Sequence, residues 1–401
     1  MNTSLCDCAE LKKEHDPPDS PNSVGWVKPY KVILADSSNP LPLDSGVNLA
    51  PVTVEYETYG ELNKKKDNAI FIMHALTGDA HAAGWDSNWK ILKRPWRNDR
   101  PGWWDNAIGP GKVFDTKCYF IICANILGSC YGTTGPWEIN PVSKKPYGLD
   151  FPVVTIDDIV RLQVRLLDYL QIEKLRAVAG GSLGGKQTLT WAIKYPDRLK
   201  SAIILASAAR LGAQGLAFNA VGRRAIFKDP GFNNGQYYNS THPDAGLELA
   251  RMLGHITYLS YDSMENKFGR RMKNGDKPSF QLEGEFSVEG YLEHQGRSFA
   301  QRFDANSYLF LTRAMDYYDA AHYGNGDLEM AFSLMKAKLQ IIAFSSDWLY
   351  PPVSAREMAR AAVANYRPVS YHEINTCYGH DAFLLEIDKI APLLKEFLSN
   401  V

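Results

Sequence analysis

The stretch Gly180-Gly181-Ser182-Leu183-Gly184-Gly185 decides how this chain folds. It fits the pattern G-x-S-x-G, which places a serine on a sharp turn between a strand and a helix, with its hydroxyl facing outward. An apolar run, 175–179, leads into the turn, and a helix-type run, 186–195, leaves it and stops before Pro196. Glycines remove the Cβ atoms that would collide in so sharp a turn. The stretch therefore predicts an exposed nucleophile, Ser182, although a serine in a glycine-rich turn can also serve only as a helix cap.

Strand-type and helix-type runs alternate around this turn. The strand-type runs are 53–58, 69–73, 119–124, 175–179, 202–206, 339–344 and 369–374. Several of them are continuously apolar, which is typical of a parallel sheet covered on both faces. The clearest helical pattern, 156–170, opens at Thr155 with Asp158 three residues on, a capping-box arrangement. The alternation predicts an α/β fold, a mostly parallel sheet flanked by helices.

Residues 217–320 interrupt this alternation. They are rich in glycine, tyrosine and asparagine, carry helix-type patterns, and have few strand signals. We interpret them as an inserted helical cap over the carboxyl edge of the sheet, where open α/β sheets bind their ligands. Such a cap would exclude water from a reacting centre. The expected organisation is therefore an N-terminal arm at 1–40, a core in two parts at 41–216 and 321–401, and the cap between them.

A serine nucleophile needs a base, and the base needs an acid to orient it. In α/β-hydrolases these residues follow one another in the order serine, acid, histidine. Asp347 comes just after the strand-type run 339–344, and His380 comes after the last such run. The order and position predict a triad of Ser182, Asp347 and His380. Asp347 could instead cap the helix that begins near Pro351.

The same chemistry requires two N–H donors for the oxyanion of a tetrahedral intermediate. One should be the backbone N–H of Leu183, directly after the nucleophile. The other should come from a loop after an early strand, and His74-Ala75-Leu76-Thr77-Gly78 follows the run 69–73. We assign it to the backbone N–H of Leu76, which could otherwise be an ordinary apolar loop residue, and expect His74 to support the loop.

Composition narrows the class of protein. The chain has 401 residues, of which 45% are hydrophobic and 22% charged, with a formal net charge of −1. This balance gives no reason to expect binding to nucleic acid or to an anionic membrane. The first twenty residues lack the apolar centre of a signal peptide. Six irregularly spaced cysteines suit reduced thiols in the cytoplasm, and Cys6-x-Cys8 has no second pair with which to bind a metal.

Wider segments around these motifs resemble the homoserine O-acetyltransferase family, α/β-hydrolase-fold enzymes that transfer acyl groups. The resemblance covers about residues 45–400. The matching segments are His74-Ala75-Leu76-Thr77-Gly78-Asp79-Ala80-His81, the glycine-rich turn, Ala217-Phe218-Asn219-Ala220-Val221-Gly222-Arg223, Gly254-His255-Ile256-Thr257-Tyr258-Leu259-Ser260, Arg302-Phe303-Asp304-Ala305-Asn306-Ser307-Tyr308, and the segments around Asp347 and His380. The family commonly has methionine where this chain has Leu183; because that position contributes its backbone N–H, the change should be tolerated.

The resemblance implies roles for two further residues. Arg223, after the F-N-x-V block, would bind the carboxylate of the substrate, and Asp381, directly after the predicted base, would bind its amine. An amino acid carries one charge of each sign, and a planar guanidinium suits a carboxylate. Arg223 could instead be a surface cation, as could its neighbour Arg224, and Asp381 could be a helix N-cap.

The activity implied by the resemblance is transfer of acetyl from acetyl-CoA, through acyl-Ser182, to the hydroxyl of L-homoserine in methionine synthesis. It needs no metal or redox cofactor, and it implies a homodimer. Three alternatives stay open: transfer of succinyl or to another hydroxyl acceptor, hydrolysis by an esterase or thioesterase, and a non-catalytic binding protein. The complete Ser182, Asp347 and His380 set argues against the last, and Arg223 with Asp381 favours an amino-acid acceptor over water.

Overall fold

A computed structural model describes residues 15–275, 277–280, 282 and 284–401 of this chain. Its main sheet has eight strands in the order β12-β11-β10-β9-β6-β8-β5-β2. The strands are β2 (Tyr30–Ala35), β5 (Val52–Tyr59), β6 (Ala69–Met73), β8 (Phe120–Ala124), β9 (Leu175–Gly181), β10 (Leu199–Leu205), β11 (Lys338–Phe344) and β12 (Val369–Ile374). The six strands from β12 to β8 are parallel, and β5 and β2 pair antiparallel at one edge.

All seven predicted strands are present, within a few residues at each end. The sequence did not indicate β2, which lies inside the predicted arm at 1–40, so the sheet begins before the expected core boundary at 41. Strand β2 lies at the edge of the sheet, and its side chains are poorly buried. Ile33 is 63% exposed, and Val32 and Leu34 are only half-buried. Residues 1–14 of the predicted arm lie outside the described residues.

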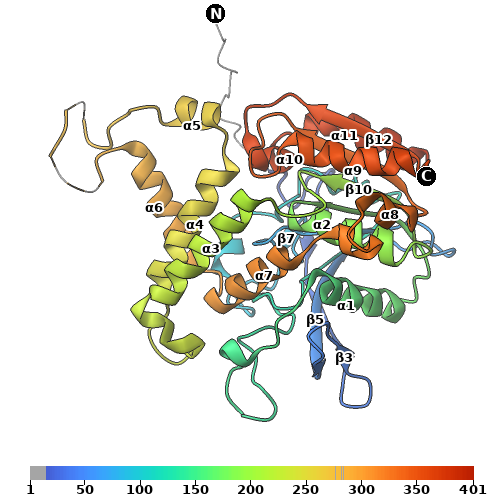
Figure 1. Ribbon diagram of the computed structural model, residues 1–401, viewed down its shortest axis with the longest axis horizontal. Coiled ribbons are helices and arrows are strands. Elements are labelled where there is room, and N and C mark those ends of the chain that lie inside the picture. The colour runs from blue at the N-terminus through green and yellow to red at the C-terminus, as the bar shows by residue number, and fades with distance from the viewer. Residues whose placement is uncertain (1–14, 276, 281, 283) are drawn as a thin grey trace, which may run out of the picture.

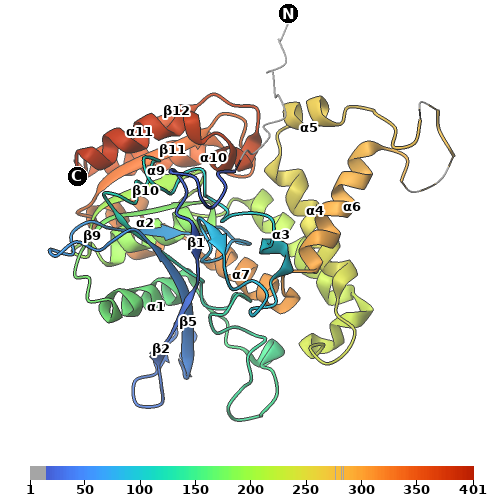
Figure 2. The same ribbon diagram turned by 180° about the vertical axis from the view of Figure 1, so that it is seen from behind.

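Helices cover both faces of the sheet (Figures 1 and 2). Helices α1 (Ile156–Tyr169), α2 (Leu183–Lys194) and α9 (Pro352–Ala364) pack on one face, and α11 (Ile387–Ser399) packs on the other. Successive side chains of a strand point to opposite faces. In β6, accordingly, Phe71 and Met73 join the first core cluster, and Ile70 and Ile72 join the second. The capping box predicted at the start of α1 is formed, because Thr155 and Asp158 each accept a hydrogen bond from the other's backbone N–H.

The described residues between β10 and β11 form helices and no strand of the main sheet. These helices are α3 (Ala213–Lys228), α4 (Asp244–Tyr258), α5 (Tyr261–Lys267), α6 (Ser287–Ala300), α7 (Ala305–Tyr317) and α8 (Leu328–Ser333). Helix α3 starts before the expected cap boundary at 217. We call α3 to α6 the cap helices; they project to one side of the sheet, away from the C-terminus, and α7 runs between them and the core (Figures 1 and 2).

The cysteines differ from the expectation at one position. Cys377 is disulfide-bonded, whereas Cys118, Cys123 and Cys130 are free. The prediction of reduced thiols was therefore wrong at Cys377; Cys6 and Cys8 lie outside the described residues. Across the part of the chain that the structure describes, no helix has the length and apolar character needed to cross a membrane.

The turn between β9 and α2 requires glycine at Gly184. A Cβ atom there would overlap the carbonyl oxygen of Met73, which is backbone and cannot move aside. Gly184→Ala is expected to lower the free energy of unfolding by about 1–3 kcal/mol, through overpacking. Gly290 of α6 is the matched control, because a Cβ there would make only ordinary contact with the flexible Lys273 side chain. Gly290→Ala should be neutral or stabilising by up to about 1 kcal/mol. Urea unfolding followed by circular dichroism measures both, and equal midpoints would contradict the prediction.

Candidate active site

Ser182 lies at the junction of β9 and α2 with φ 58° and ψ −122°, a conformation that is costly for a residue other than glycine. Two hydrogen bonds hold this turn in place. The Ser182 N–H donates to the carbonyl of Leu205, 3.0 Å away, and the Ser207 hydroxyl donates to the Ser182 carbonyl at 2.8 Å. The strained serine therefore presents its side chain at the carboxyl edge of the sheet, as the turn motif predicted.

His380 and Asp347 form a buried pair at the same edge. His380 Nδ1 lies 2.8 Å from Asp347 Oδ2, and the two residues are 3% and 2% exposed. The other oxygen, Oδ1, accepts the backbone N–H groups of Leu349 and Tyr350 at 3.0 and 2.9 Å. Asp347 therefore contacts the imidazole and the loop before α9 with different oxygens; α9 has no side-chain cap, so Asp347 does not cap this helix.

The charge of Asp347 tunes the imidazole. Burial, the largest influence, acts to lower the pKa of His380, but the charge and hydrogen bond of Asp347, with a contribution from Asp381, raise it overall. Because Nδ1 faces Asp347, Nε2 is left as the nitrogen that can exchange a proton with a reacting group. This is the geometry that a general base requires.

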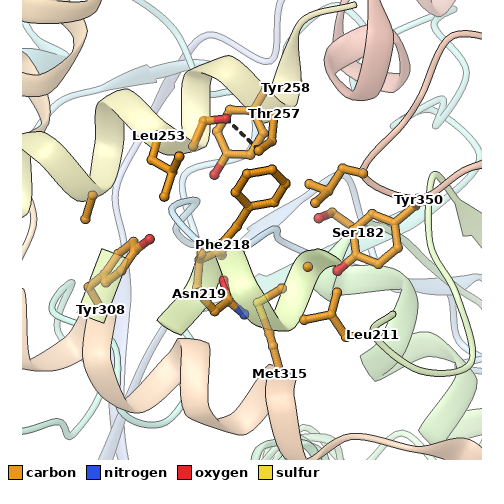
Figure 3. A pocket seen from close by; sticks show the side chains of 15 residues that line it. Ser182, Leu211, Phe218, Asn219, Leu253, Thr257, Tyr258, Tyr308, Met315 and Tyr350 are labelled. Carbon is orange, nitrogen blue, oxygen red and sulfur yellow. Dashed lines mark hydrogen bonds between the residues drawn. The ribbon is translucent and has the colours of Figure 1, made fainter. Parts of the chain in front are cut away.

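Ser182 and His380 approach the same aromatic side chain. The Tyr350 ring centroid is 5.3 Å from that of His380, and Figure 3 shows this ring beside Ser182. Phe383 contacts both the turn before Ser182 and the His380 ring. Its ring edge lies 2.5 Å from the position that a Cβ of Gly181 would take, and its ring centroid lies 5.8 Å from that of His380. The hydrogen bonds between described residues do not include one from Ser182 Oγ to His380. Contacts of this kind are often loose before substrate binds.

One of the two predicted oxyanion donors, Leu76, borders the pocket that Ser182 lines. The loop that carries Leu76 touches the start of α2 at Gly184. Leu183 is the first residue of α2, so its N–H has no partner within the helix. His74 supports this loop as expected: its Nδ1 lies 2.8 Å from the Ala75 carbonyl, and its Nε2 accepts the Ile126 N–H at 3.3 Å.

Arg223 is buried at the inner side of α3, and its neighbour Arg224 is exposed. Its Nη2 lies 2.6 Å from Asp316 Oδ2 of α7, and Asn219 donates to the other oxygen of Asp316 at 2.8 Å. Arg223 Nη1 is buried and has no hydrogen-bond partner. The surface-cation interpretation of Arg223 is therefore wrong. Asn219, which shares Asp316 with Arg223, lines the pocket that contains Ser182 (Figure 3).

Asp381 ends the single turn η5 (Gly379–Asp381) that also carries His380. It stands at the N-cap position of α10 (Ala382–Leu385), but its side chain makes no capping hydrogen bond there, so the N-cap interpretation finds no support. The Asp381 charge acts on His380, Arg251 and Tyr258. The structure thus brings Asp381 to the site, one residue from the base.

Sequence reasoning did not single out Lys186. It is fully buried in α2, donates to the Ala208 carbonyl at 3.2 Å, and has its ammonium 5.1 Å from the ring centroids of both Tyr318 and Tyr350. Burial lowers the pKa of Lys186 to about 7. The signal in the sequence was a lysine directly after a glycine turn, at the start of a helix whose other positions are apolar or small. Lys186 therefore lies against the Tyr350 ring, which lines the Ser182 pocket.

Comparisons with known proteins agree with this fold. The profile of the alpha/beta hydrolase fold matches residues 68–387. The structure of esterase E22 superposes with a TM-score of 0.83 at 32% identity, covering 93% of this chain and 100% of that one. The structure of homoserine O-acetyltransferase from Bacillus anthracis superposes with a TM-score of 0.84 at 30% identity, covering 93% and 97%. The fold and these likenesses define an enzyme of the alpha/beta hydrolase fold.

Sequence relatives identify the family to which this enzyme belongs. A homoserine O-acetyltransferase from Methanohalobium evestigatum is 52% identical over 360 residues, 90% of this chain and 71% of that protein. A homoserine O-succinyltransferase from Acidithiobacillus ferrooxidans is 48% identical over 382 residues, 95% of this chain and 97% of that protein. This chain belongs to the homoserine O-acetyltransferase family, which is a family of acyltransferases.

Proposed function

We propose that this chain transfers an acetyl group from acetyl-CoA to the hydroxyl of L-homoserine, a step of methionine biosynthesis. The observation that carries the proposal is the buried His380–Asp347 pair at the carboxyl edge of the sheet, beside a strained Ser182. Arg223, whose Nη1 is unpartnered and whose partner Asp316 also binds the pocket residue Asn219, supports an amino-acid acceptor. The proposed reaction uses no metal and no redox cofactor.

In the first half-reaction, Ser182 Oγ attacks the thioester carbonyl while His380 Nε2 accepts its proton. Asp347 stabilises the imidazolium that forms, since it already raises the pKa of His380. The N–H groups of Leu76 and Leu183 stabilise the oxyanion, a contribution that is typically worth about 10²–10³-fold in rate for each donor. His380 returns the proton to the departing thiolate, leaving acetyl-Ser182.

In the second half-reaction, homoserine replaces CoA. Its carboxylate binds Arg223 Nη1, its ammonium binds Asp381, and its hydroxyl gives a proton to His380 as it attacks the acyl-enzyme. The ester bond to Ser182 Oγ then breaks, and Ser182 takes the proton back from His380 as O-acetylhomoserine leaves. Holding the hydroxyl in place gives it a high effective concentration, so that it outcompetes water. Ser182, its pocket and the Arg223–Asp316 pair lie under the cap helices α3 and α4, which limit access of solvent.

Arg223→Ala is the direct test of the acceptor site. We expect it to leave acylation of Ser182 by acetyl-CoA within about threefold of wild type and to lower kcat/KM for homoserine by about 10²-fold, because a charge-assisted hydrogen bond is lost. Single-turnover mass spectrometry measures the first step, and steady-state CoA release measures the second. Arg224→Ala is the matched control, since that side chain is exposed. Equal loss in both half-reactions of Arg223→Ala would contradict the assigned role.

Hydrolysis is the second candidate function, favoured by the likeness to esterase E22. An esterase would use the same Ser182, Asp347 and His380 with water as the acceptor. CoA release in the absence of homoserine distinguishes the two: an acyltransferase releases one equivalent and stops, whereas a thioesterase continues. Succinyl-CoA in place of acetyl-CoA, tested in the same assay, addresses the activity that the relative from Acidithiobacillus ferrooxidans is named for.

We further propose that the protein is a cytoplasmic homodimer. Cap helices α3 and α4 carry exposed apolar side chains that a second copy would cover: Leu216, Val221, Phe227, Leu249 and Ile256 are 37–58% exposed. Large exposed apolar side chains that cluster on neighbouring helices are typical of an interface. The disulfide at Cys377 is the one observation that does not fit a reducing compartment.

A further inference from the structure

Two arginines from the cap segment meet at the loop that carries Leu76. Arg251 of α4 has its Nη1 3.4 Å from the Thr77 hydroxyl, and Arg302, just after α6, donates from Nη1 to the Thr77 carbonyl at 3.3 Å. Both guanidinium groups lie against the ring of Phe299, with their central carbons 4.7 and 5.2 Å from its centroid. Two positive charges are therefore held within reach of one residue, Thr77, directly after the predicted oxyanion donor.

No carboxylate forms an ion pair with Arg251 or Arg302 among the ion pairs of the described residues. Their polar partners are neutral: the hydroxyl and carbonyl of Thr77, and the Tyr131 hydroxyl, which lies 2.9 Å from Arg302 Nη1. Arg251 Nε is buried and has no hydrogen-bond partner. The two guanidinium charges thus have only neutral hydrogen-bond partners among the described residues, and such a pair favours an anion.

Two carboxylates and a histidine face the arginine pair. The carboxylates that act on the two arginines from nearby residues are Asp381, on Arg251, and Asp79, on Arg302, and Asp79 already pairs with Arg97. Burial, together with the charges of Arg251 and Arg302, lowers the pKa of His255 to about 3, so that this imidazole is neutral. Its Nε2 is buried and also lacks a hydrogen-bond partner.

The arginine pair lies between two cavities. Toward the active site, the Arg251 guanidinium is 5.5 Å from the ring of Tyr258, which lines the Ser182 pocket and lies 6.0 Å from the His380 ring. On the other side, Arg302 and Thr77 border a second cavity of about 330 Å³, whose wall also includes Arg97, Arg100 and Trp103. The arginine pair therefore lies beside the loop of the predicted oxyanion donor Leu76, at which an acyl donor would bind.

We propose that Arg251 and Arg302 bind an anionic group of the acyl donor, either a carboxylate at the end of the acyl chain or a phosphate of CoA. This inference rests on the proposed function and assigns its donor side. Guanidinium groups suit carboxylates and phosphates equally, because both present paired oxygens to the planar fork of donors. The homoserine carboxylate does not need this site, since Arg223 serves it.

The test compares four donors on the full-length protein: acetyl-CoA, succinyl-CoA, and the N-acetylcysteamine thioesters of acetate and succinate, which lack phosphate. The variant is Arg251→Met, which keeps an unbranched side chain without charge. Arg297→Met, at an exposed position of α6, is the matched control. Arg251→Lys, which retains the charge, and thermal unfolding of every variant separate a charge effect from misfolding.

Either of two patterns supports the proposal. If the site holds the acyl carboxylate, kcat/KM of Arg251→Met falls about 10–100-fold for both succinyl donors and stays unchanged for both acetyl donors. If it holds a phosphate, both CoA esters lose that factor and both short thioesters keep their rates. An equal loss with all four donors, no loss with any, or a rise only in KM for homoserine would overturn it.

A binding measurement keeps the inference separate from the proposed function. Titration calorimetry with CoA and with succinate should give at least tenfold weaker binding of one of them to Arg251→Met than to wild type. Should the wild-type protein acylate homoserine from no donor, the proposed function fails, and the calorimetry still decides on the anion site. Equal affinities of wild type and Arg251→Met for both compounds would reject the site.

Discussion

Ser182→Ala is expected to lower kcat for acyl transfer by about 10⁶-fold, the loss typical of removing the nucleophile of a serine triad. The hydroxyl is the atom that bonds to the acyl group, and no other described hydroxyl takes its place at the end of β9. The Tyr350 hydroxyl is close by, but burial raises its pKa, so it stays protonated and is a poor nucleophile. What remains is the contribution of the oxyanion donors and substrate binding.

Intact-protein mass spectrometry after brief exposure to acetyl-CoA measures the effect directly. Wild type should gain one acetyl group in the absence of homoserine and lose it when homoserine is added, while Ser182→Ala should gain none. Ser207→Ala is the matched control, because Ser207 is buried beside the turn and donates only to the Ser182 carbonyl. It should remain acylated at a rate within about tenfold of wild type. A stable acetyl adduct on Ser182→Ala would show that another residue is the nucleophile.

The elements around the nucleophile could be predicted because their physical requirements are local. Buried parallel strands are often continuously apolar, which made several of the seven predicted strands visible in the sequence. The capping box of α1 is a three-residue pattern and is formed as expected. The turn at Ser182 needs glycine at fixed positions, and Gly184 touches the carbonyl of Met73 closely enough to exclude any side chain. Each of these signals depends on neighbours in sequence.

The features that could not be predicted from the sequence depend on contacts between distant segments. In the sequence alone, Arg223 could be a surface helix cation. In the structure, Asp316 of α7, 93 residues later, lies 2.6 Å from it. Arg251 and Arg302 are ordinary helix residues in sequence, and only the packing of α4 and the end of α6 against Thr77 joins them. Strand β2 was missed because an edge strand leaves Ile33 exposed, and thus lacks the alternation of a half-buried strand.

Asp347→Asn is expected to lower kcat by about 10⁴-fold, the second large effect. The Asp347 carboxylate accepts the Nδ1–H of His380 through Oδ2 at 2.8 Å, and two backbone N–H groups through Oδ1. An amide preserves the shape and one acceptor oxygen, which the backbone N–H groups of Leu349 and Tyr350 will claim. The amide NH₂ group then faces His380 and favours the tautomer with its proton on Nε2, which cannot accept a proton from Ser182.

The pH dependence of the same variant isolates the charge of Asp347 from its shape. In wild type the pKa of His380 is raised, so the base becomes neutral, and therefore active, only above the ordinary histidine range near 6.5. Without the carboxylate charge, burial alone acts against the imidazolium, and the acid limb of kcat/KM for the acylation step should move to lower pH. The residual activity of Asp347→Asn should accordingly fall less steeply on acidification than that of wild type.

The loss of stability in Asp347→Asn should be larger at low pH than at high pH. A raised pKa means that the folded state binds the proton on His380 more tightly, so this stabilisation is fully present below the unfolded pKa and is lost as pH rises through the folded one. Asp347→Asn removes it, and the loss of melting temperature should therefore be larger at pH 5.5 than at pH 8.5. Wild type and variant with the same acid limb, and a melting difference that does not change between these pH values, would mean that Asp347 only shapes the loop and does not hold the charge of His380.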